Sequence, residues 1–208
     1  MRDAAALPRQ IDAIAIGASA GGVEALSVLL PALPSGSQLS LFVVLHLPRE
    51  RPSLLAEIFA PKCALKVREA EDKMHVEPGT VYFAPPDYHL LLDAGPQLAL
   101  SIDELVHFSR PSIDVLFESA ADIYAERLMG IILTGANDDG AAGLATIHRT
   151  GGVTIVQEPD SAQVPLMALS ALRQTAADFV LPLEKIAGLL HSLASRELKT
   201  KDTLRKGK

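Results

Sequence analysis

Short apolar runs alternate with amphipathic segments along most of the chain. The apolar runs predict buried β-strands at residues 11–16, 41–45, 65–68, 130–133, 153–156 and 179–181. The segments between them predict helices at residues 22–30, 53–59, 112–124, 140–149, 161–175 and 183–193. Continuous apolar strands separated by helices are typical of a parallel sheet with both faces covered. The pattern therefore predicts a doubly wound α/β fold with a mostly parallel sheet flanked by helices.

The alternation changes between residues 80 and 102. Strand-like segments at 81–84, 89–92 and 97–101 follow one another with only turns between them. One of these turns is Asp93-Ala-Gly-Pro96, which has the composition of a tight turn. This region predicts an antiparallel β meander inserted in the α/β frame.

The first predicted strand ends in a turn of small residues, Gly17-Ala-Ser-Ala-Gly21, and a helical pattern follows at once. A serine on such a strand-to-helix turn is exposed, and backbone N–H groups at the start of the helix point toward whatever it attacks. An acyl-transfer nucleophile needs this arrangement. Small residues at such turns also serve tight packing or phosphate binding, so the motif alone leaves these alternatives open.

A dinucleotide-binding site is excluded by two positions. A Rossmann fingerprint has glycine where Ser19 stands, and it has an acidic residue at the end of the second strand to hold a ribose hydroxyl. The second strand here ends in His46. A histidine in that place is poorly suited to ribose and well suited to act as a general base.

A third candidate group follows the strand at 130–133. The loop after it places Asp138 and Asp139 just before a helix. The carboxyl ends of parallel strands lie on one edge of the sheet, with neighbouring strands about 4.8 Å apart. Ser19, His46 and one of the aspartates would then lie within reach of one another, as in a Ser-His-Asp triad. The alternative for either aspartate is a helix N-cap.

Composition excludes several classes of protein. The chain has 208 residues, 49% of them hydrophobic, and its mean hydropathy is +0.24, which predicts one globular domain. The net charge of −6 argues against a nucleic-acid-binding surface. We find no signal peptide or membrane span, so we expect a cytoplasmic protein. Cys63 is the single cysteine and the histidines have no metal-ligand spacing, so we expect neither a disulfide nor a metal site.

The end of the chain differs from the rest in charge. Residues 196–208 contain six Lys or Arg against two Asp or Glu and lack apolar periodicity. This predicts a solvated basic tail, with a docking arm as the alternative. We therefore divide the chain into an N-terminal extension at 1–10, one domain at 11–194 and the tail at 195–208.

From residue 11 to residue 186 the sequence resembles the catalytic domain of the CheB family, the chemotaxis protein-glutamate methylesterases. The resemblance rests on several blocks in the same order. They are Gly17-Ala-Ser-Ala-Gly-Gly22, Val43-Val-Leu-His-Leu-Pro48, Val81-Tyr-Phe-Ala-Pro-Pro-Asp-Tyr-His-Leu-Leu-Leu92, Arg110-Pro-Ser-Ile-Asp-Val-Leu-Phe117, Leu133-Thr-Gly-Ala-Asn-Asp-Asp-Gly-Ala-Ala-Gly143 and the segment from Gln157-Glu-Pro159 to Met167.

The resemblance implies that Ser19 is the nucleophile, His46 the base and Asp139 the orienting acid. Asp139 is preferred because the aspartate of the family directly precedes a glycine. Backbone N–H groups of Ala20 and Ala136 are the implied oxyanion donors. The implied reaction is hydrolysis of glutamate methyl esters on the cytoplasmic helices of methylated chemoreceptors, with deamidation of receptor glutamines as a side activity. It needs no metal or organic cofactor.

The sequence departs from the family pattern in four respects. Ala20 stands where some members have threonine, Ala136-Asn137 replaces a Met-Gly pair, and Ala168 replaces a proline. Only ten residues precede the first strand, whereas regulatory members carry a receiver domain there. We therefore expect a domain without a receiver, whose control would come from a regulatory partner protein. Two other functions stay open: an esterase of the same fold in another signalling pathway, and a catalytically silent binding module.

Overall fold

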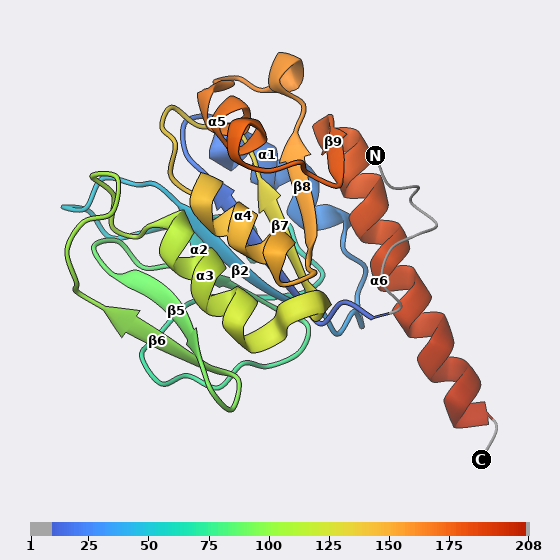
Figure 1. The fold of residues 1–208 in the computed structure, drawn as a ribbon. Coiled ribbons are helices and arrows are strands. Elements are labelled where there is room, and N and C mark those ends of the chain that lie inside the picture. Colours follow the sequence, from blue (N-terminus) through green and yellow to red (C-terminus); the bar gives the residue numbers. More distant parts are fainter. Residues whose placement is uncertain (1–9, 207–208) are drawn as a thin grey trace.

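The computed structural model describes the backbone of residues 10–206 and the side chains of residues 10–196. Its strands are β1 Ala13–Ala18, β2 Ser40–Leu45, β3 Lys66–Glu69, β4 Thr80–Phe83, β5 His89–Asp93, β6 Gln97–Ser101, β7 Leu128–Ile132, β8 Val153–Gln157 and β9 Phe179–Leu181. Seven of them form one sheet in the order β3-β4-β2-β1-β7-β8-β9, in which every neighbouring pair is parallel (Figure 1).

Helices cover both faces of this sheet. They are α1 Gly22–Leu29, α2 Leu55–Phe59, α3 Ile113–Tyr124, α4 Ala141–Arg149, α5 Leu166–Gln174 and α6 Leu183–Lys206, with short 3₁₀ turns η2 Leu30–Ala32, η3 Ala125–Arg127 and η4 Pro159–Ser161. One buried cluster packs α1, α2 and α6 against one face, and a second packs α3, α4 and α5 against the other. The layers are those of the predicted doubly wound fold.

Alternating side chains along β1 serve the two cores. Ile14 and Ile16 face α1 and α6, whereas Ala13 and Ala15 face α3. The small side chains on the second face let α3 approach closely. A Cβ at Gly17 would lie only 2.3 Å from Cγ2 of Ile113. The N-terminus of α3 is thus seated against the carboxyl end of β1.

The antiparallel part is smaller than the predicted meander. Strands β5 and β6 pair with each other as an antiparallel hairpin, which forms a separate two-stranded sheet. The first segment of the expected meander is β4, and it pairs in parallel with β2 and β3. All four residues of β4 are buried, which is typical of a strand inside a parallel sheet covered on both faces.

Two helix boundaries differ by more than two residues from those predicted. Helix α6 continues to Lys206, through most of the segment expected as a solvated tail, and extends away from the sheet in Figure 1. Residues 194–206 contain no glycine or proline and are rich in good helix formers, which explains the continuation. Helix α5 starts at Leu166 rather than at residue 161, directly after Pro165. The expected N-terminal extension lies outside the described residues, apart from Gln10.

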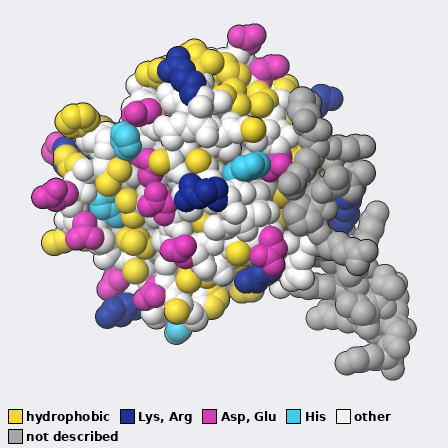
Figure 2. Space-filling view, viewed as in Figure 1, with side chains coloured by type: hydrophobic (Ala, Val, Ile, Leu, Met, Phe, Trp, Pro, Cys, Tyr) yellow, Lys and Arg dark blue, Asp and Glu magenta, His cyan; other side chains and the backbone are white. Residues whose placement is uncertain are grey.

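The sheet changes direction at β1. From β1 the chain adds β2 and β4 on one side, and it later returns to add β7, β8 and β9 on the other. Ligands of open α/β sheets bind at the carboxyl ends of strands at such a switch point. None of the helices in the described part of the chain is long and apolar enough to cross a membrane. Figure 2 shows acidic and basic side chains interspersed on the face that carries α3 and α4.

Candidate active site

Ser19 directly follows β1 and lies on the turn into α1. Its N–H donates to the Thr134 carbonyl at 2.9 Å, and its carbonyl accepts from the Gly22 N–H at 2.8 Å. Gly21 has a φ of 80°, in the left-handed region that favours glycine. A Cβ there would also lie 2.4 Å from Oε1 of Gln163. The turn therefore fixes Ser19 between the loop after β7 and the start of α1.

His46 directly follows β2, on the strand next to β1. Its N–H donates to the Ala18 carbonyl at 3.1 Å, and the register pairs Ala18 with Leu45. Ser19 and His46 thus stand at equivalent positions, each directly after the last residue of one of two adjacent parallel strands. Within the part of the chain that the structure describes, the Ser19 hydroxyl makes no hydrogen bond and His46 directs its ring to other partners.

Asp139 is completely buried and contacts His46 directly. Its Oδ2 lies 2.8 Å from Nε2 of the imidazole. The same carboxylate accepts from the N–H groups of Ile113 and Asp114 at 2.7 and 3.1 Å, and from the Ser112 hydroxyl at 2.8 Å. These donors stand at the N-terminus of α3, where unpaired N–H groups and the helix dipole favour an anion.

These contacts keep Asp139 ionised. Burial raises the pKa of this carboxyl, but the hydrogen bonds from His46, Ile113 and Asp114 outweigh the burial, and the pKa lies below its ordinary value. Because the carboxylate can only accept, Nε2 of His46 carries the proton between them. In the neutral ring, Nδ1 then keeps its lone pair and is the nitrogen able to act as a base.

Asp138 points in another direction. It is exposed, and its Oδ1 lies 3.1 Å from Nδ1 of His107. Helix α4 begins after Gly140 without any side-chain cap. The N-cap alternative therefore does not hold at α4 for either aspartate. Of the two adjacent aspartates, Asp139 is the one that reaches His46.

The two predicted oxyanion donors lie on the loops after β1 and β7. Thr134 Oγ1 donates to the Ala20 carbonyl at 2.8 Å, which ties the two loops together. The second loop is fixed further by Gly135, whose N–H donates to Val164. In the described residues no group accepts a hydrogen bond from the N–H of Ala20 or Ala136. Both N–H groups are therefore free to donate to a ligand.

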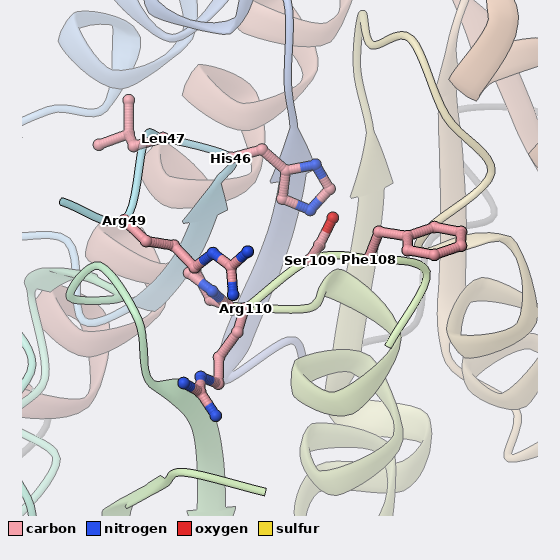
Figure 3. Close-up of a pocket in the computed structure, with 7 residues that line it drawn as sticks. His46, Leu47, Arg49, Phe108, Ser109 and Arg110 are labelled. Atoms are coloured by element: carbon pink, nitrogen blue, oxygen red, sulfur yellow. The ribbon is translucent and has the colours of Figure 1, made fainter. Parts of the chain in front are cut away.

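A cavity of about 80 Å³ opens beside His46. Its walls come from the loop after β2 and from the segment before α3: His46, Leu47, Arg49, Phe108, Ser109, Arg110 and Pro111 (Figure 3). Arg110 is fixed by hydrogen bonds to Asp87 and to the carbonyls of Ile102 and Asp103. Phe108 is 93% exposed, and in Figure 3 its ring points away from His46.

Sequence patterns missed the residues that support Asp139 from the α3 side. Ser112 is the N-cap of α3, and its hydroxyl also accepts from the Val115 N–H. His89 is buried; its Nδ1 accepts from the Ser112 N–H, and its Nε2 lies 3.0 Å from the Glu104 carbonyl. A serine just before a helical pattern is a recognisable N-cap signal. No sequence signal places His89 behind it.

The described residues contain no group of three or more His, Cys, Asp or Glu side chains arranged to hold a metal ion. The two buried acidic side chains of this region, Asp139 and Asp114, have other partners. Asp139 accepts from His46 and α3, and Asp114 accepts from the Gly143 N–H at 2.6 Å.

Comparison with known proteins identifies a family and several relatives of this chain. Residues 14–190 match the family described as CheB methylesterase. A relative from Leptospira interrogans is 46% identical over 187 residues, which cover 90% of this chain and 97% of the relative. A protein-glutamate methylesterase/protein-glutamine glutaminase from Methanosarcina acetivorans is 39% identical over 190 residues, covering 88% of this chain. The match spans about half, 52%, of the Methanosarcina protein.

The fold is also similar to a solved structure. The crystal structure of the Thermotoga maritima CheB methylesterase catalytic domain superposes with a TM-score of 0.84 and 34% sequence identity. The superposition covers 88% of this chain and 99% of the Thermotoga domain. The likeness therefore extends over nearly the whole described chain.

Proposed function

The chain belongs to the CheB methylesterase family, and from this premise we propose that it hydrolyses methyl esters of glutamate side chains on methylated chemoreceptors. The observation that carries the proposal is the His46–Asp139 pair, with Asp139 fully buried and His46 partly buried, which stands at the strand end next to Ser19. Relatives are also named protein-glutamine glutaminases. That activity is the same acyl transfer on an amide, so the proposal includes deamidation of receptor glutamines.

In the first step Ser19 attacks the ester. Its Oγ bonds to the carbonyl carbon while its proton moves to Nδ1 of His46, and the carbonyl electron pair becomes an oxyanion. The free N–H groups of Ala20 and Ala136 donate to that oxyanion. When the carbonyl re-forms, the C–O bond to the methoxy group breaks, and the leaving oxygen takes the proton from Nδ1. Methanol departs and an acyl-enzyme remains on Ser19.

In the second step water replaces Ser19 as the nucleophile and attacks the acyl-enzyme. It gives one proton to Nδ1 of His46 and attacks the acyl carbon, and the proton then passes to Oγ of Ser19 as that bond breaks. The products are the glutamate side chain and the free serine. Throughout, Asp139 accepts from Nε2 and stabilises the positively charged ring, because its own charge is held by the donors of α3.

The cellular setting is part of the same proposal. The substrate is a methylated receptor whose glutamate methyl esters lie on its cytoplasmic helices. The reaction takes place in the cytoplasm. The catalytic unit is the domain at residues 11–194, and a regulatory partner protein controls access to it.

The test is methanol release from membranes that carry a methylated receptor. We expect the purified chain to release methanol from them far faster than it hydrolyses a generic activated ester such as p-nitrophenyl acetate. Ser19→Ala should abolish both reactions, since loss of a triad nucleophile costs about 10⁶-fold in a well-studied protease. The variant should keep its melting temperature because Ser19 makes no side-chain hydrogen bond in the described residues.

Each other outcome has a definite meaning. Fast hydrolysis of the activated ester with no methanol release would replace the receptor substrate with another ester. A folded wild type inactive on both would favour a silent binding module. Full activity in Ser19→Ala would remove the nucleophile assignment.

A further inference from the structure

Asn137 faces the nitrogen of His46 that the proposed reaction uses. It lies two residues before Asp139 in the loop after β7 and is partly buried. Its Nδ2 is 3.5 Å from Nδ1 of His46 and 3.4 Å from Oγ of Ser109. Figure 3 shows the Ser109 hydroxyl pointing toward the same ring. Since Nε2 is committed to Asp139, the carboxamide of Asn137 stands next to the only nitrogen left to act as a base.

The other end of the carboxamide is unsatisfied. Oδ1 of Asn137 is buried and has no hydrogen-bond partner in the described part of the chain. A buried carbonyl oxygen without a donor is unfavourable and uncommon in folded proteins. Donation from Nδ2 into Nδ1 suits a neutral ring, but it leaves this oxygen without a partner.

Protonation of His46 reverses the preference. Once Nδ1 carries a proton it must donate, and an N–H group of Asn137 facing it is repulsive. A half-turn of the carboxamide puts Oδ1 in place of Nδ2. It then accepts from Nδ1–H, and the Ser109 hydroxyl can turn to donate to it in place of the His107 carbonyl, to which it donates at 3.3 Å in this structure. The half-turn therefore supplies the buried oxygen with donors when the ring is charged.

From these contacts we infer that Asn137 is a positioning residue for the hydrolysis. Its carboxamide donates to the neutral ring of His46 and, turned over, accepts from the charged ring. Asn137 exchanges no proton itself. The proton comes from Ser19 or water and leaves on methanol or Ser19. This inference rests on the proposed function and concerns the same site.

The test combines kinetics with ring ¹⁵N NMR. Asn137→Ala should lower kcat for methanol release about tenfold with KM within about twofold, because the lost contact acts on the charged ring of the transition state. Asn137→Asp presents oxygen in both orientations. Its His46 ring should stay protonated to a pH about one unit or more above that of the wild type. The His46 signals are assigned by their loss in His46→Gln.

The other charged groups near the ring stay the same in Asn137→Ala and Asn137→Asp. They are Asp139 on Nε2, and Arg49 and Arg110 in the walls of the cavity, the latter paired with Asp87. Asp138→Asn is the matched control, because it changes the adjacent, exposed residue of the same loop. It should leave kcat and the His46 titration unchanged.

The outcomes separate this inference from the proposed function. Identical His46 titrations in wild type, Asn137→Ala and Asn137→Asp, or an unchanged kcat in Asn137→Ala, would overturn the role of Asn137 while leaving the esterase intact. Absence of Ser19-dependent methanol release from the wild type would overturn the esterase itself. The NMR titration would still test the contact between Asn137 and His46 in that case.

Discussion

At the scale of single residues, Asp139 serves two structures at once. It accepts a hydrogen bond from Nε2–H of His46, and it also accepts hydrogen bonds from the N–H groups of Ile113 and Asp114 at the start of α3. An acid in this position orients an imidazole and stabilises a helix terminus with the same two oxygens. Its substitution should therefore affect both turnover and folding.

Asp139→Asn and Asp138→Asn should separate the adjacent aspartates. The amide at 139 offers His46 the wrong partner, a change that costs about 10⁴-fold in kcat in a well-known triad. Asp138→Asn removes an exposed pair with His107 and should change stability by less than about 1 kcal/mol, with kcat unchanged. Methanol release and thermal unfolding measure the two effects. A reversed order of kcat would move the acid to Asp138.

Asp114 should make stability depend on pH in the opposite sense to Asp139. Burial raises the pKa of Asp114 to about 6, and Asp139 adds to this while the Gly143 N–H and His107 oppose it. Between a pH equal to the ordinary pKa of 3.8 and a pH of about 6, the native state therefore binds more protons than the unfolded state. The stabilisation from this group is complete below about pH 4 and is lost as the pH rises through 6.

Replacement by asparagine removes that titration. The free energy of unfolding of the wild type, minus that of Asp114→Asn, should fall by on the order of 2 kcal/mol between pH 4 and pH 7. Asp122→Asn, on the exposed side of the same helix, is the control and should show no such trend. Denaturant titrations at several pH values measure both differences, and a flat difference for Asp114 would contradict the expectation.

The residues predicted from sequence share one property. Ser19, His46 and Asp139 each follow a buried strand, and parallel strands bring their carboxyl ends together, so position along the chain carries the information. His89 and Asn137 have no such signal. Their partners are set by how the segment before α3 packs over the sheet, and neither periodicity nor spacing encodes that contact.

At the scale of elements, the close contact of α3 with α4 holds the N-terminus of α3 in place next to Asp139. Gly143 in α4 lies against α3, where its N–H donates to Asp114 and a Cβ would lie 2.6 Å from Cβ of Phe117. Separation of these helices would pull the start of α3 away from Asp139. The packing of two helices thus determines the geometry of a side-chain pair.

Gly143→Ala and Gly188→Ala should have opposite effects. Both glycines stand inside helices, where alanine gains up to about 1 kcal/mol in helix propensity. At position 188 a Cβ meets nothing within 4 Å, so the gain should appear as added stability. At position 143 the Cβ meets Phe117 and the backbone of Asp114, so the variant should lose about 1–3 kcal/mol. Denaturant unfolding measures both, and equal signs would contradict the packing argument.

Element types were predictable where the period was clear, and pairing partners were less so. The strands of the parallel sheet and the α/β class follow from apolar runs between helical segments, and the resemblance to the family is confirmed by the relatives. The four-residue strand β4 reads equally well as part of a meander, because a short apolar run does not say which neighbour it pairs with. The end of α6 was missed because its last turns lack apolar periodicity.

At the scale of the whole molecule, the sheet brings three parts of the chain that are distant in sequence together at the carboxyl ends of its strands. Helix α6 covers one face of this sheet. The side chains that anchor α6 among the described residues are Ile186, Leu190, Leu193 and Ala194. We therefore propose that the folding unit is complete near residue 194. Methylesterase activity should need nothing beyond it.

Shortened chains test that boundary. A chain that stops after Arg196 should keep the free energy of unfolding to within about 0.5 kcal/mol and keep its rate of methanol release. A chain that stops before Ile186 uncovers the core under α6 and should fail to fold cooperatively. Circular dichroism during denaturation compares the two, and a large loss in the longer chain would place the boundary further along α6.

The direction of β1 has a consequence for anything joined to this domain. The strand runs from Ala13 toward Ser19, so a domain fused in front of Ile11 is attached at the opposite edge of the sheet. Six residues of strand span about 20 Å, so a tether must cover at least that distance to bring the fused domain over the site. A tether of two or three residues keeps it on the far side, whereas a dozen extended residues let it reach. Tether length would then set the effective concentration of the fused domain at Ser19.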